Sequence, residues 1–363
     1  MTDLLNVADF AAEAERVLPA DAFAYLATGA CDEVTLRENI EAFGRWQFRP
    51  RMLVDVSATS TATTVLGTEV SMPILVAPTA GHRQYHPDGE EATARAAAAA
   101  GTVMCLSIAA SSTAAQLDAA APGAPRWLQA NVYRHPDFLQ RLVDYATKHG
   151  FGAIVLTVDT PFVGRRERPL RLGSTSPGGS ANRDLALQRD LLGTEAPPDL
   201  DATLTWRDLE ALVRSSPVPV VVKGILTAED AELACAAGVS AIIVSNHGGR
   251  QLDGSPATLD ALPEVVAAAF DGVEVLVDGG VRRGTDVVKA LALGARAVLV
   301  GRPVCYGLAV DGAAGAERVL ELLRAETTLA LALLGCPTPE DVTAAHLRPS
   351  PRATPLPAEV VER

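Results

Sequence analysis

The 363-residue sequence has no long hydrophobic run. Every apolar stretch is much shorter than the roughly 20 residues that a helix needs to cross a bilayer. The N-terminal stretch MTDLLNVADFAAEAERVL is acidic and amphipathic, whereas a signal peptide is basic and then continuously apolar. We therefore expect a cytoplasmic protein without a membrane partner.

Positive charge and cysteine are also scarce. Lys and Arg number 31 against 44 Asp and Glu, and the formal net charge of −13 argues against nucleic acid as a partner, because phosphate contacts need clustered basic residues. The five cysteines form no CxxC pair and mostly lie in apolar runs, so we expect reduced core residues without a disulfide or metal role. They are Cys31, Cys105, Cys235, Cys305 and Cys336.

Apolar residues, by contrast, make up 48% of the chain, which is enough for one large core. Eight short runs rich in Val, Ile and Leu alternate with helical segments, several of which end at a glycine. Continuous apolar runs of this length are typical of strands buried on both faces of a parallel sheet. The pattern predicts an α/β protein with a (β/α)8 TIM barrel. The runs are 73–79, 102–108, 126–132, 153–159, 218–224, 241–247, 273–279 and 297–303.

We expect residues 1–363 to form a single domain. Residues 1–65 precede the first predicted barrel strand as an N-terminal helical cover, and residues 66–345 form the barrel. The segment from about 170 to 204 follows the fourth strand and is rich in Gly, Pro, Ser and Asp, which favours a lid over the barrel mouth. The Pro-rich residues 346–363 are predicted to form a flexible tail.

Polar residues gather where the predicted strands end. In barrels of this kind the loops at the carboxyl ends of the strands converge on one mouth and carry the chemistry, while the opposite face serves stability. The strand ends therefore predict the site. They contain Thr79, Ala80, Ser107, Gln129, Asn131, Thr157, Asp159, Lys223, Ser245, His247, Arg250, Asp278, Gly279, Gly280, Gly301 and Arg302.

The last two strands end in DGGVRRGTD and GRPV. These segments place glycine amides, Arg282 and Arg302 near helix N-termini, where backbone N–H groups and the helix dipole attract a phosphate. Either segment alone would be explained by tight turns and surface arginines. Together they predict a phosphate-binding cup.

Lys223 ends the buried run VPVVVK, so its ammonium group must face a partner or lose its proton. It could be a fixed positive charge beside an electron-rich cofactor, a neutral amine that forms a Schiff base, or a structural lysine paired with a carboxylate.

His247 alone would be an ordinary hydrogen-bonded histidine. Arg250, which can bind a carboxylate through two hydrogen bonds, and Asp159, which could hold the imidazole and favour its protonated form, favour a base beside an anion clamp. Such a site suits the removal of hydrogen from a carbon next to a carboxylate.

At these residues the sequence resembles the FMN-dependent α-hydroxy acid oxidase and dehydrogenase family, which includes glycolate oxidase, lactate oxidase and hydroxymandelate oxidase. The most specific segment is SNHGGRQLDG, and LTVDTP, VGRRE, VVKGILTAEDA, DGGVRRGTDVVKALALGA and VGRP support it in the same order. The resemblance implies FMN as the cofactor, a homotetramer, and His247 as the base with Asp159 as its partner. It further implies that Arg250, Arg166 and Tyr25 bind the substrate carboxylate.

The resemblance also implies which residues bind the flavin. Lys223 would stabilise the negative charge of the reduced ring. The other expected cofactor ligands are Thr79, Ala80, Ser107, Gln129, Thr157, Ser245, Asp278, Gly280, Arg282, Gly301 and Arg302.

Two positions depart from the family pattern, and both remove bulk from the pocket. Ala109 stands where many small-acid oxidases carry an aromatic residue, and Asn131 stands at the position of a substrate-contacting tyrosine. Tyr85 and His82 either line the enlarged space or lie on the surface. We therefore expect oxidation of an L-2-hydroxy acid bulkier than glycolate or lactate, with O2 as acceptor. The alternatives are oxidation of an α-amino or peptide-like intermediate, a Schiff-base aldolase that uses Lys223, and a catalytically silent flavin-binding protein. A quinone or a carrier protein is the alternative to O2 as the electron acceptor.

Overall fold

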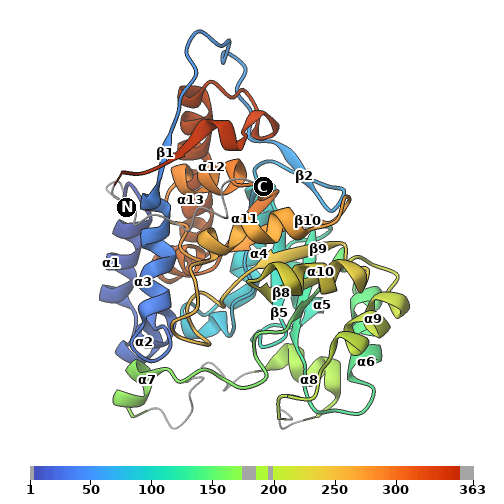
Figure 1. Ribbon diagram of the computed structural model, residues 1–363. Helices are drawn as coiled ribbons and strands as arrows, with labels where there is room; N and C mark the ends of the chain where they lie inside the picture. Colours follow the sequence, from blue (N-terminus) through green and yellow to red (C-terminus); the bar gives the residue numbers. More distant parts are fainter. Residues whose placement is uncertain (1–3, 174–184, 195–198, 352–363) are drawn as a thin grey trace.

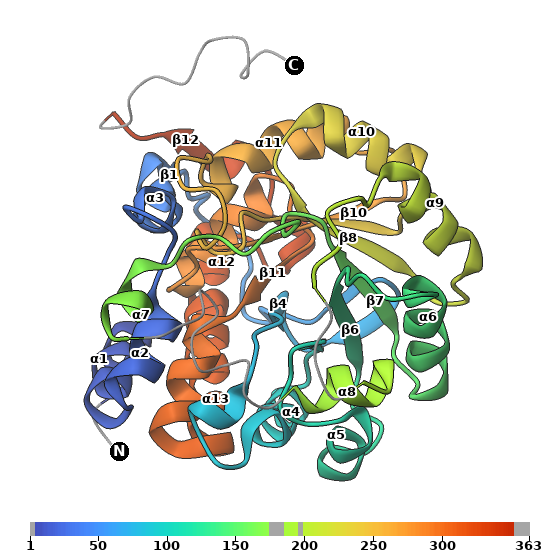
Figure 2. The ribbon, with the colours of Figure 1, turned by 90° about the horizontal axis from the view of Figure 1, so that it is seen from below.

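The computed structural model describes residues 4–173, 185–194 and 199–351. Eight parallel strands close into a barrel in the order β10-β11-β4-β5-β6-β7-β8-β9, which confirms the predicted (β/α)8 architecture (Figure 2). Each strand overlaps one of the eight predicted apolar runs. The strands are β4 (Ile74–Val76), β5 (Met104–Ser107), β6 (Arg126–Asn131), β7 (Ala153–Thr157), β8 (Val220–Ile225), β9 (Ala241–Val244), β10 (Glu274–Asp278) and β11 (Ala297–Val300).

Helices surround the barrel and follow the strands in turn (Figures 1 and 2). Side-chain caps fix several of their starts. Thr113 forms a capping box with Gln116 at the start of α5, and the Thr227 hydroxyl accepts from the Asp230 N–H at the start of α10. The outer helices are α4 (Gly89–Ala99), α5 (Ala114–Ala120), α6 (Phe138–Lys148), α9 (Trp206–Ser215), α10 (Ala228–Ala236), α11 (Thr258–Ala268), α12 (Gly284–Ala292) and α13 (Arg302–Leu334).

The N-terminal segment packs against α13 at one side of the barrel, where Figure 1 shows it in blue. It contains α1 (Val7–Val17), α2 (Ala20–Ala27), α3 (Val34–Glu41) and the 3-10 turn η1 (Ala42–Arg45). Strand β1 (Trp46–Phe48) pairs antiparallel with β12 (Leu347–Pro349), so the first residues of the predicted flexible tail are held in a sheet. Turns η4 (Pro339–Asp341) and η5 (Ala344–His346) precede β12.

The predicted lid contributes helix α8 (Ala186–Leu192), which follows the short helix α7 (Glu167–Arg171). Residues 174–184 and 195–198 of the predicted lid, and residues 352–363 of the predicted tail, lie outside the described residues. No helix in the described part of the chain is both long enough and apolar enough to span a membrane. All five cysteines are free, and four are buried, but Cys31 is exposed, so the expected core position is wrong for that residue.

The barrel strands bury both of their faces, and alternate residues serve two different cores. Residues such as Leu106, Ile154 and Val222 pack outward with the helices. Their neighbours, such as Trp127 and Val221, fill the barrel interior. The hairpin of β2 (Thr63–Val65) and β3 (Thr68–Val70) adds Val65 and Val70 to this inner cluster. The interior is therefore a packed apolar layer on which a polar layer can be built.

Candidate active site

The inward-facing positions turn polar at the carboxyl ends of the strands. Two residues beyond the inner apolar residues Cys105, Trp127, Val155, Val221, Ile243 and Leu276 stand Ser107, Gln129, Thr157, Lys223, Ser245 and Asp278. Because successive strand residues point to opposite faces, this spacing keeps each polar side chain on the barrel interior. The strand pattern itself therefore assembles the site.

These residues surround a cavity of about 640 Å³. Among the predicted site residues, all line this cavity except Asp159 and Ser245. Those two lie directly behind it, because Asp159 bonds to His247 and Ser245 accepts a hydrogen bond from Lys223. The predicted residues that line it are Tyr25, Thr79, Ala80, Ser107, Ala109, Gln129, Asn131, Thr157, Arg166, Lys223, His247, Arg250, Asp278, Gly279, Gly280, Arg282, Gly301 and Arg302.

His247 and Asp159 form a close pair. The Nδ1 atom of His247 is 2.9 Å from Oδ1 of Asp159 and 3.3 Å from the Thr160 hydroxyl. Burial lowers the pKa of His247 from its ordinary value, and Asp159 opposes that shift. Burial would raise the pKa of Asp159, but the positive charges of His247 and Lys223 outweigh it and hold this pKa at about 2. The pair thus consists of an ionised carboxylate and an imidazole that is neutral near pH 7, which is the state that a general base requires.

The backbone at His247 is unusual. His247 has a φ of 60°, and Gly248 and Gly249 follow with φ values of 64° and 73°. A left-handed conformation is uncommon for a residue with a side chain and is typical of functional sites. A Cβ atom at residue 249 would lie 2.6 Å from the Leu36 backbone nitrogen, so glycine is required there for α3 to approach. The HGG sequence therefore turns the imidazole into the cavity and admits the N-terminal cover.

Two arginines stack on Tyr25. The guanidinium carbons of Arg250 and Arg166 lie 4.7 and 5.8 Å from the centre of its ring. Burial would raise the pKa of Tyr25, but the two positive charges outweigh it and lower this pKa. Arg250 donates from Nη1 to the carbonyl oxygens of Tyr25 and Thr28, while the buried Nε of Arg166 has no hydrogen-bond partner among the described residues. A cavity wall with a phenol and two positive charges is suited to a carboxylate.

Lys223 remains charged. Its Nζ is 3.3 Å from Oδ2 of Asp278 and donates to the Ser245 hydroxyl at 2.8 Å. Burial would lower the pKa of Lys223, but Asp278 and Asp159 outweigh burial and raise this pKa. A Schiff-base lysine must be neutral to attack a carbonyl group, so the pairing favours the fixed positive charge over the aldolase alternative.

The part of the cavity that Arg302 and Arg282 line fits an anion. Arg302 donates to the carbonyl oxygens of Leu26, Thr28 and Gly248, and burial together with Arg250 lowers its pKa to about 9. Burial also lowers the pKa of Arg282. Buried positive charges of this kind are stabilised by a bound phosphate.

A free carboxylate oxygen completes the fit to FMN. Asp278 keeps a buried Oδ1 without a partner, as a ligand to a ribityl hydroxyl would. Together with the neutral donors Ser107 and Gln129, these features make the residues present a good match to the predicted cofactor.

Tyr85 and His82 follow β4 and are buried, so the surface alternative is excluded for both. Tyr85 lines the cavity, and His82 in turn η2 (His82–Gln84) bonds through Nε2 to the Thr79 hydroxyl. The ring of His82 also contacts Thr93 through Nδ1 at 2.9 Å. His82 therefore supports Thr79 from behind and does not face the enlarged space.

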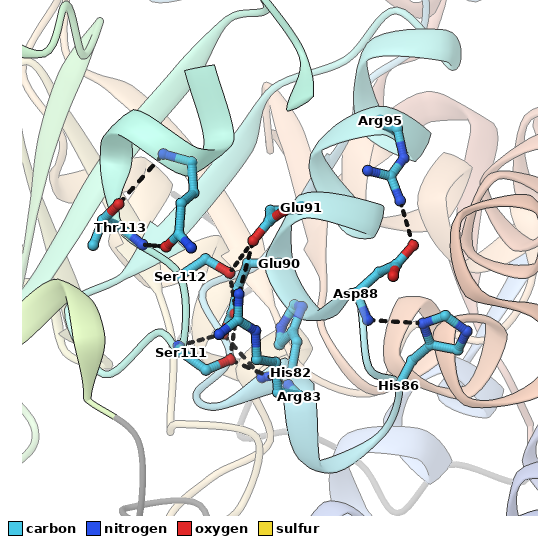
Figure 3. A network of polar contacts seen from close by, with 11 residues as sticks. His82, Arg83, His86, Asp88, Glu90, Glu91, Arg95, Ser111, Ser112 and Thr113 are labelled. Carbon is cyan, nitrogen blue, oxygen red and sulfur yellow. Dashed lines mark hydrogen bonds and ion pairs between the residues drawn. The ribbon is translucent and has the colours of Figure 1, made fainter. Parts of the chain in front are cut away.

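A buried carboxylate joins this loop to the next one (Figure 3). Glu90 accepts from the backbone N–H groups of His82 and Ser111, both at 2.9 Å, and from the hydroxyls of Ser111 and Ser112. His82 follows β4, and the two serines follow β5. Glu90 thus fixes two loops of the cavity wall against each other.

Several cavity residues were not predicted from the sequence. Tyr133 lies two residues beyond Asn131 and lines the cavity, so continued strand alternation could have found it. Thr160 follows Asp159 directly. Leu185 and Gln188 come from the α8 region, where no sequence signal marked individual residues.

Comparisons with known proteins agree with this site. The family model of the FMN-dependent dehydrogenases matches residues 14–349. Glycolate oxidase 1 of Zea mays is 49% identical over 357 residues, which cover 96% of this chain and 96% of the relative. A peroxisomal (S)-2-hydroxyacid oxidase of Arabidopsis thaliana is 47% identical, with 96% and 97% covered.

Solved structures show the same relationship. A mandelate oxidase variant with (S)-mandelic acid is 40% identical, with a TM-score of 0.86 and coverage of 96% of this chain and 99% of the other. A soluble mutant of the (S)-mandelate dehydrogenase from Pseudomonas putida is 37% identical, with a TM-score of 0.88 and coverage of 96% and 100%. The resemblance and the FMN cofactor are thus confirmed. The chain belongs to the FMN-dependent dehydrogenase family and is an FMN-dependent oxidoreductase.

Proposed function

We propose that this protein oxidises an L-2-hydroxy acid to the corresponding 2-oxo acid. The observation that carries the proposal is the placement of the His247–Asp159 pair in one cavity with the Tyr25, Arg250 and Arg166 cluster. This arrangement offers a base and a carboxylate clamp side by side. The names of the relatives, glycolate oxidase and (S)-2-hydroxyacid oxidase, support the same substrate class.

Each residue has a distinct task in this proposal. Arg250 and Arg166 bind the substrate carboxylate, and this contact orients C2 and its hydroxyl toward His247. His247 removes a proton from the substrate, and Asp159 stabilises the imidazolium that forms. Bound FMN would supply the two-electron acceptor. Lys223 contributes a fixed positive charge at the site where negative charge develops.

We further propose a substrate with an aryl or long-chain group. Ala109 and Asn131 both line the cavity, and neither fills the space that an aromatic residue would occupy. A bulky side chain would bury apolar surface there, while glycolate would leave the space to water. The mandelate enzymes among the structural relatives support an aryl group.

The α-amino or peptide-like alternative is motivated by Asn131 and by the opened cavity, and the contacts of Asn131 weaken the first of these two grounds. Asn131 accepts a hydrogen bond from Gln129 Nε2 at 3.1 Å, so its carbonyl oxygen already has a protein partner.

We propose O2 as the electron acceptor, because the curated relatives are named oxidases. A homotetramer and a cytoplasmic location stay predictions; the Arabidopsis relative is named peroxisomal.

An anaerobic experiment tests the proposed function. The purified protein with FMN should absorb near ~450 nm and bleach when an L-2-hydroxy acid is added, while the D-enantiomer should leave the spectrum unchanged. Admission of O2 should restore the colour and release H2O2. A flavin that stays oxidised with every 2-hydroxy acid would show that the proposed reaction is wrong.

A further inference from the structure

Helix α8 lines the cavity through Gln188 and is joined to the loop that carries Ala109. The Leu187 N–H at its start donates to the Ala110 carbonyl oxygen at 3.3 Å, directly after Ala109. The Tyr145 hydroxyl of α6 donates to Asp190 at 2.6 Å and holds the helix from the other side. Figure 2 shows α8 beside α5 and the end of β6. The helix is therefore fixed at the β5 and β6 side of the cavity.

Within the part of the chain that the structure describes, Gln188 of α8 is a buried polar residue without a protein partner. Its residue exposure is 1%, and neither the Nε2 nor the Oε1 atom of its side chain has a hydrogen-bond partner. The same residue lines the cavity. A buried amide group that lacks both partners is rare in folded proteins, because it loses its hydrogen bonds to water and gains none in return. A ligand in the cavity could supply the missing partner.

The neighbours of Gln188 define what kind of ligand group would fit. Leu185, Leu200 and Tyr133 line the cavity with it and are apolar or aromatic, while Arg134 and Asp199 line it next to Tyr133 and Leu200 in the sequence. The Asn131 carbonyl oxygen accepts from Gln129, whereas both polar atoms of the Gln188 amide are buried and have no hydrogen-bond partner among the described residues. A glutamine amide donates and accepts but carries no charge, which favours a neutral group that can also do both.

The phosphate-binding end lies on the opposite side of the barrel. In the closed order of eight strands, β6 is four strands away from β10, whose end carries Asp278 and Gly280. Gln188 is therefore remote from the region that suits the FMN phosphate. Because α8 is joined to the residue after Ala109, where the proposed function places the substrate side chain, the partner of Gln188 would come from that side chain.

We propose that Gln188 is a specificity-determining residue that binds an uncharged hydrogen-bonding group at the end of the substrate side chain. The substrate is then a 2-hydroxy acid with an apolar body and a terminal hydroxyl or amide. This inference rests on the proposed function, because the carboxylate clamp and His247 fix the other end of the same molecule.

A matched pair of substrates tests the inference. L-3-(4-hydroxyphenyl)lactate and L-3-phenyllactate differ by one hydroxyl, and the rate of anaerobic flavin reduction gives kcat/KM for each. We expect the hydroxylated acid to be preferred at least ~10-fold, which corresponds to about 1.4 kcal/mol. Gln188→Met keeps the length and volume of the side chain but loses both hydrogen-bonding atoms, so this variant should bring the ratio close to one.

The control is the same change at another glutamine, Gln140→Met on α6. The Gln140 amide donates to Asp144, and Gln140 does not line the cavity. It should keep the wild-type ratio. A wild-type ratio near one, or an unchanged ratio in Gln188→Met, would overturn the role of Gln188 while the proposed function stands.

Binding of inert analogues separates this inference from the reaction. 3-(4-Hydroxyphenyl)propionate and 3-phenylpropionate lack the 2-hydroxyl group and cannot be oxidised at C2. Calorimetric titration of the wild-type holoenzyme should show tighter binding of the hydroxylated analogue, and Gln188→Met should remove the difference. Equal affinity of the wild type for both analogues would overturn the inference, whereas failure of every 2-hydroxy acid to bleach the flavin would overturn the proposed function.

Discussion

Asp159 reaches His247 across the end of an intervening strand. Asp159 follows β7 and His247 follows β9, while β8 lies between these strands in the barrel. Their 2.9 Å contact passes Gly224, which has a φ of 114°. A Cβ atom at Gly224 would lie 2.8 Å from the Cβ of Asp159. The absence of a side chain at Gly224 of β8 therefore allows Asp159 to reach His247.

Asp159→Asn should shift the acid limb of the pH dependence of kcat/KM. The carboxylate raises the pKa of His247 against the effect of burial, so its removal lowers this pKa further. His247 must be neutral to accept a proton, so activity is lost as the pH falls through its pKa. The acid limb of kcat/KM should therefore shift to lower pH, and the plateau should fall by about 10-fold or more because the imidazolium loses its stabilising charge.

The pH profile of flavin reduction measures this shift. Asp201→Asn, an equally conservative change at a residue outside the cavity lining, should leave the limb in place. A limb that moves to higher pH in Asp159→Asn would show that the carboxylate does not act on His247 as described.

Gly224→Ala should weaken the contact between Asp159 and His247 without changing either of these residues. The added methyl group would displace Asp159, and its backbone would be strained at a φ of 114°. We expect the acid limb to shift in the same direction as in Asp159→Asn, with slower flavin reduction. Gly238→Ala is the control, because Gly238 also has a positive φ but lies near Val213, away from the site. Matching pH profiles for the two alanine variants would argue against this role of Gly224.

His247→Ala should leave FMN bound and slow flavin reduction by about 10²-fold or more, because the base is lost while the phosphate-binding residues remain. Stopped-flow absorbance gives the rate, and the visible spectrum of the purified variant reports the bound cofactor. Reduction at the wild-type rate would show that His247 is not the base.

Arg250→Lys tests the carboxylate clamp. Nη1 of Arg250 is held by two backbone carbonyl groups, so the rest of the guanidinium is oriented for the substrate. A lysine keeps the charge but loses the planar fork and its stacking on Tyr25, so KM should rise and kcat should fall. Steady-state kinetics with the true substrate check this, and unchanged constants would exclude Arg250 as the clamp.

The barrel and the inner polar layer could be predicted because both follow from strand alternation. Val221 fills the barrel interior, so Lys223 must face the same space two residues later. The same reasoning places Gln129 after Trp127 and Asp278 after Leu276. The alternation of side chains depends only on position along one strand, so it can be read from the sequence.

Other features depend on contacts between distant segments. The pairing of β12 with β1 joins residues about 300 positions apart, and nothing in a Pro-rich tail indicates it. Gln188 is polar and lies in a segment without a clear period, so its burial follows only from the docking of α8 on the loop after Ala109. Tyr85 is buried because its loop folds over the barrel mouth, which the sequence left open. Such positions require the tertiary structure.

The double change Ala109→Trp with Asn131→Tyr should reverse the size preference. In the unmodified protein, aryl or long-chain 2-hydroxy acids should have a kcat/KM at least about 10-fold above that of glycolate, a difference of ~1.4 kcal/mol. A small acid leaves apolar contacts unmade, at roughly 0.8 kcal/mol per methylene, and moves more freely relative to His247. The two larger side chains would fill the space beneath α8 and restore these contacts for glycolate.

The measurement is the kcat/KM for acids of increasing size in the wild type and the double variant, with bound FMN checked by absorbance. Phe162→Ala serves as a control, because Phe162 also lines the cavity but is 75% exposed, so its removal should change the size preference little. If glycolate or lactate is the best substrate of the unmodified protein, the space at Ala109 and Asn131 does not receive the substrate side chain. In that case Gln188 of α8 would have a role other than substrate selection, because its buried amide group would still need a hydrogen-bond partner.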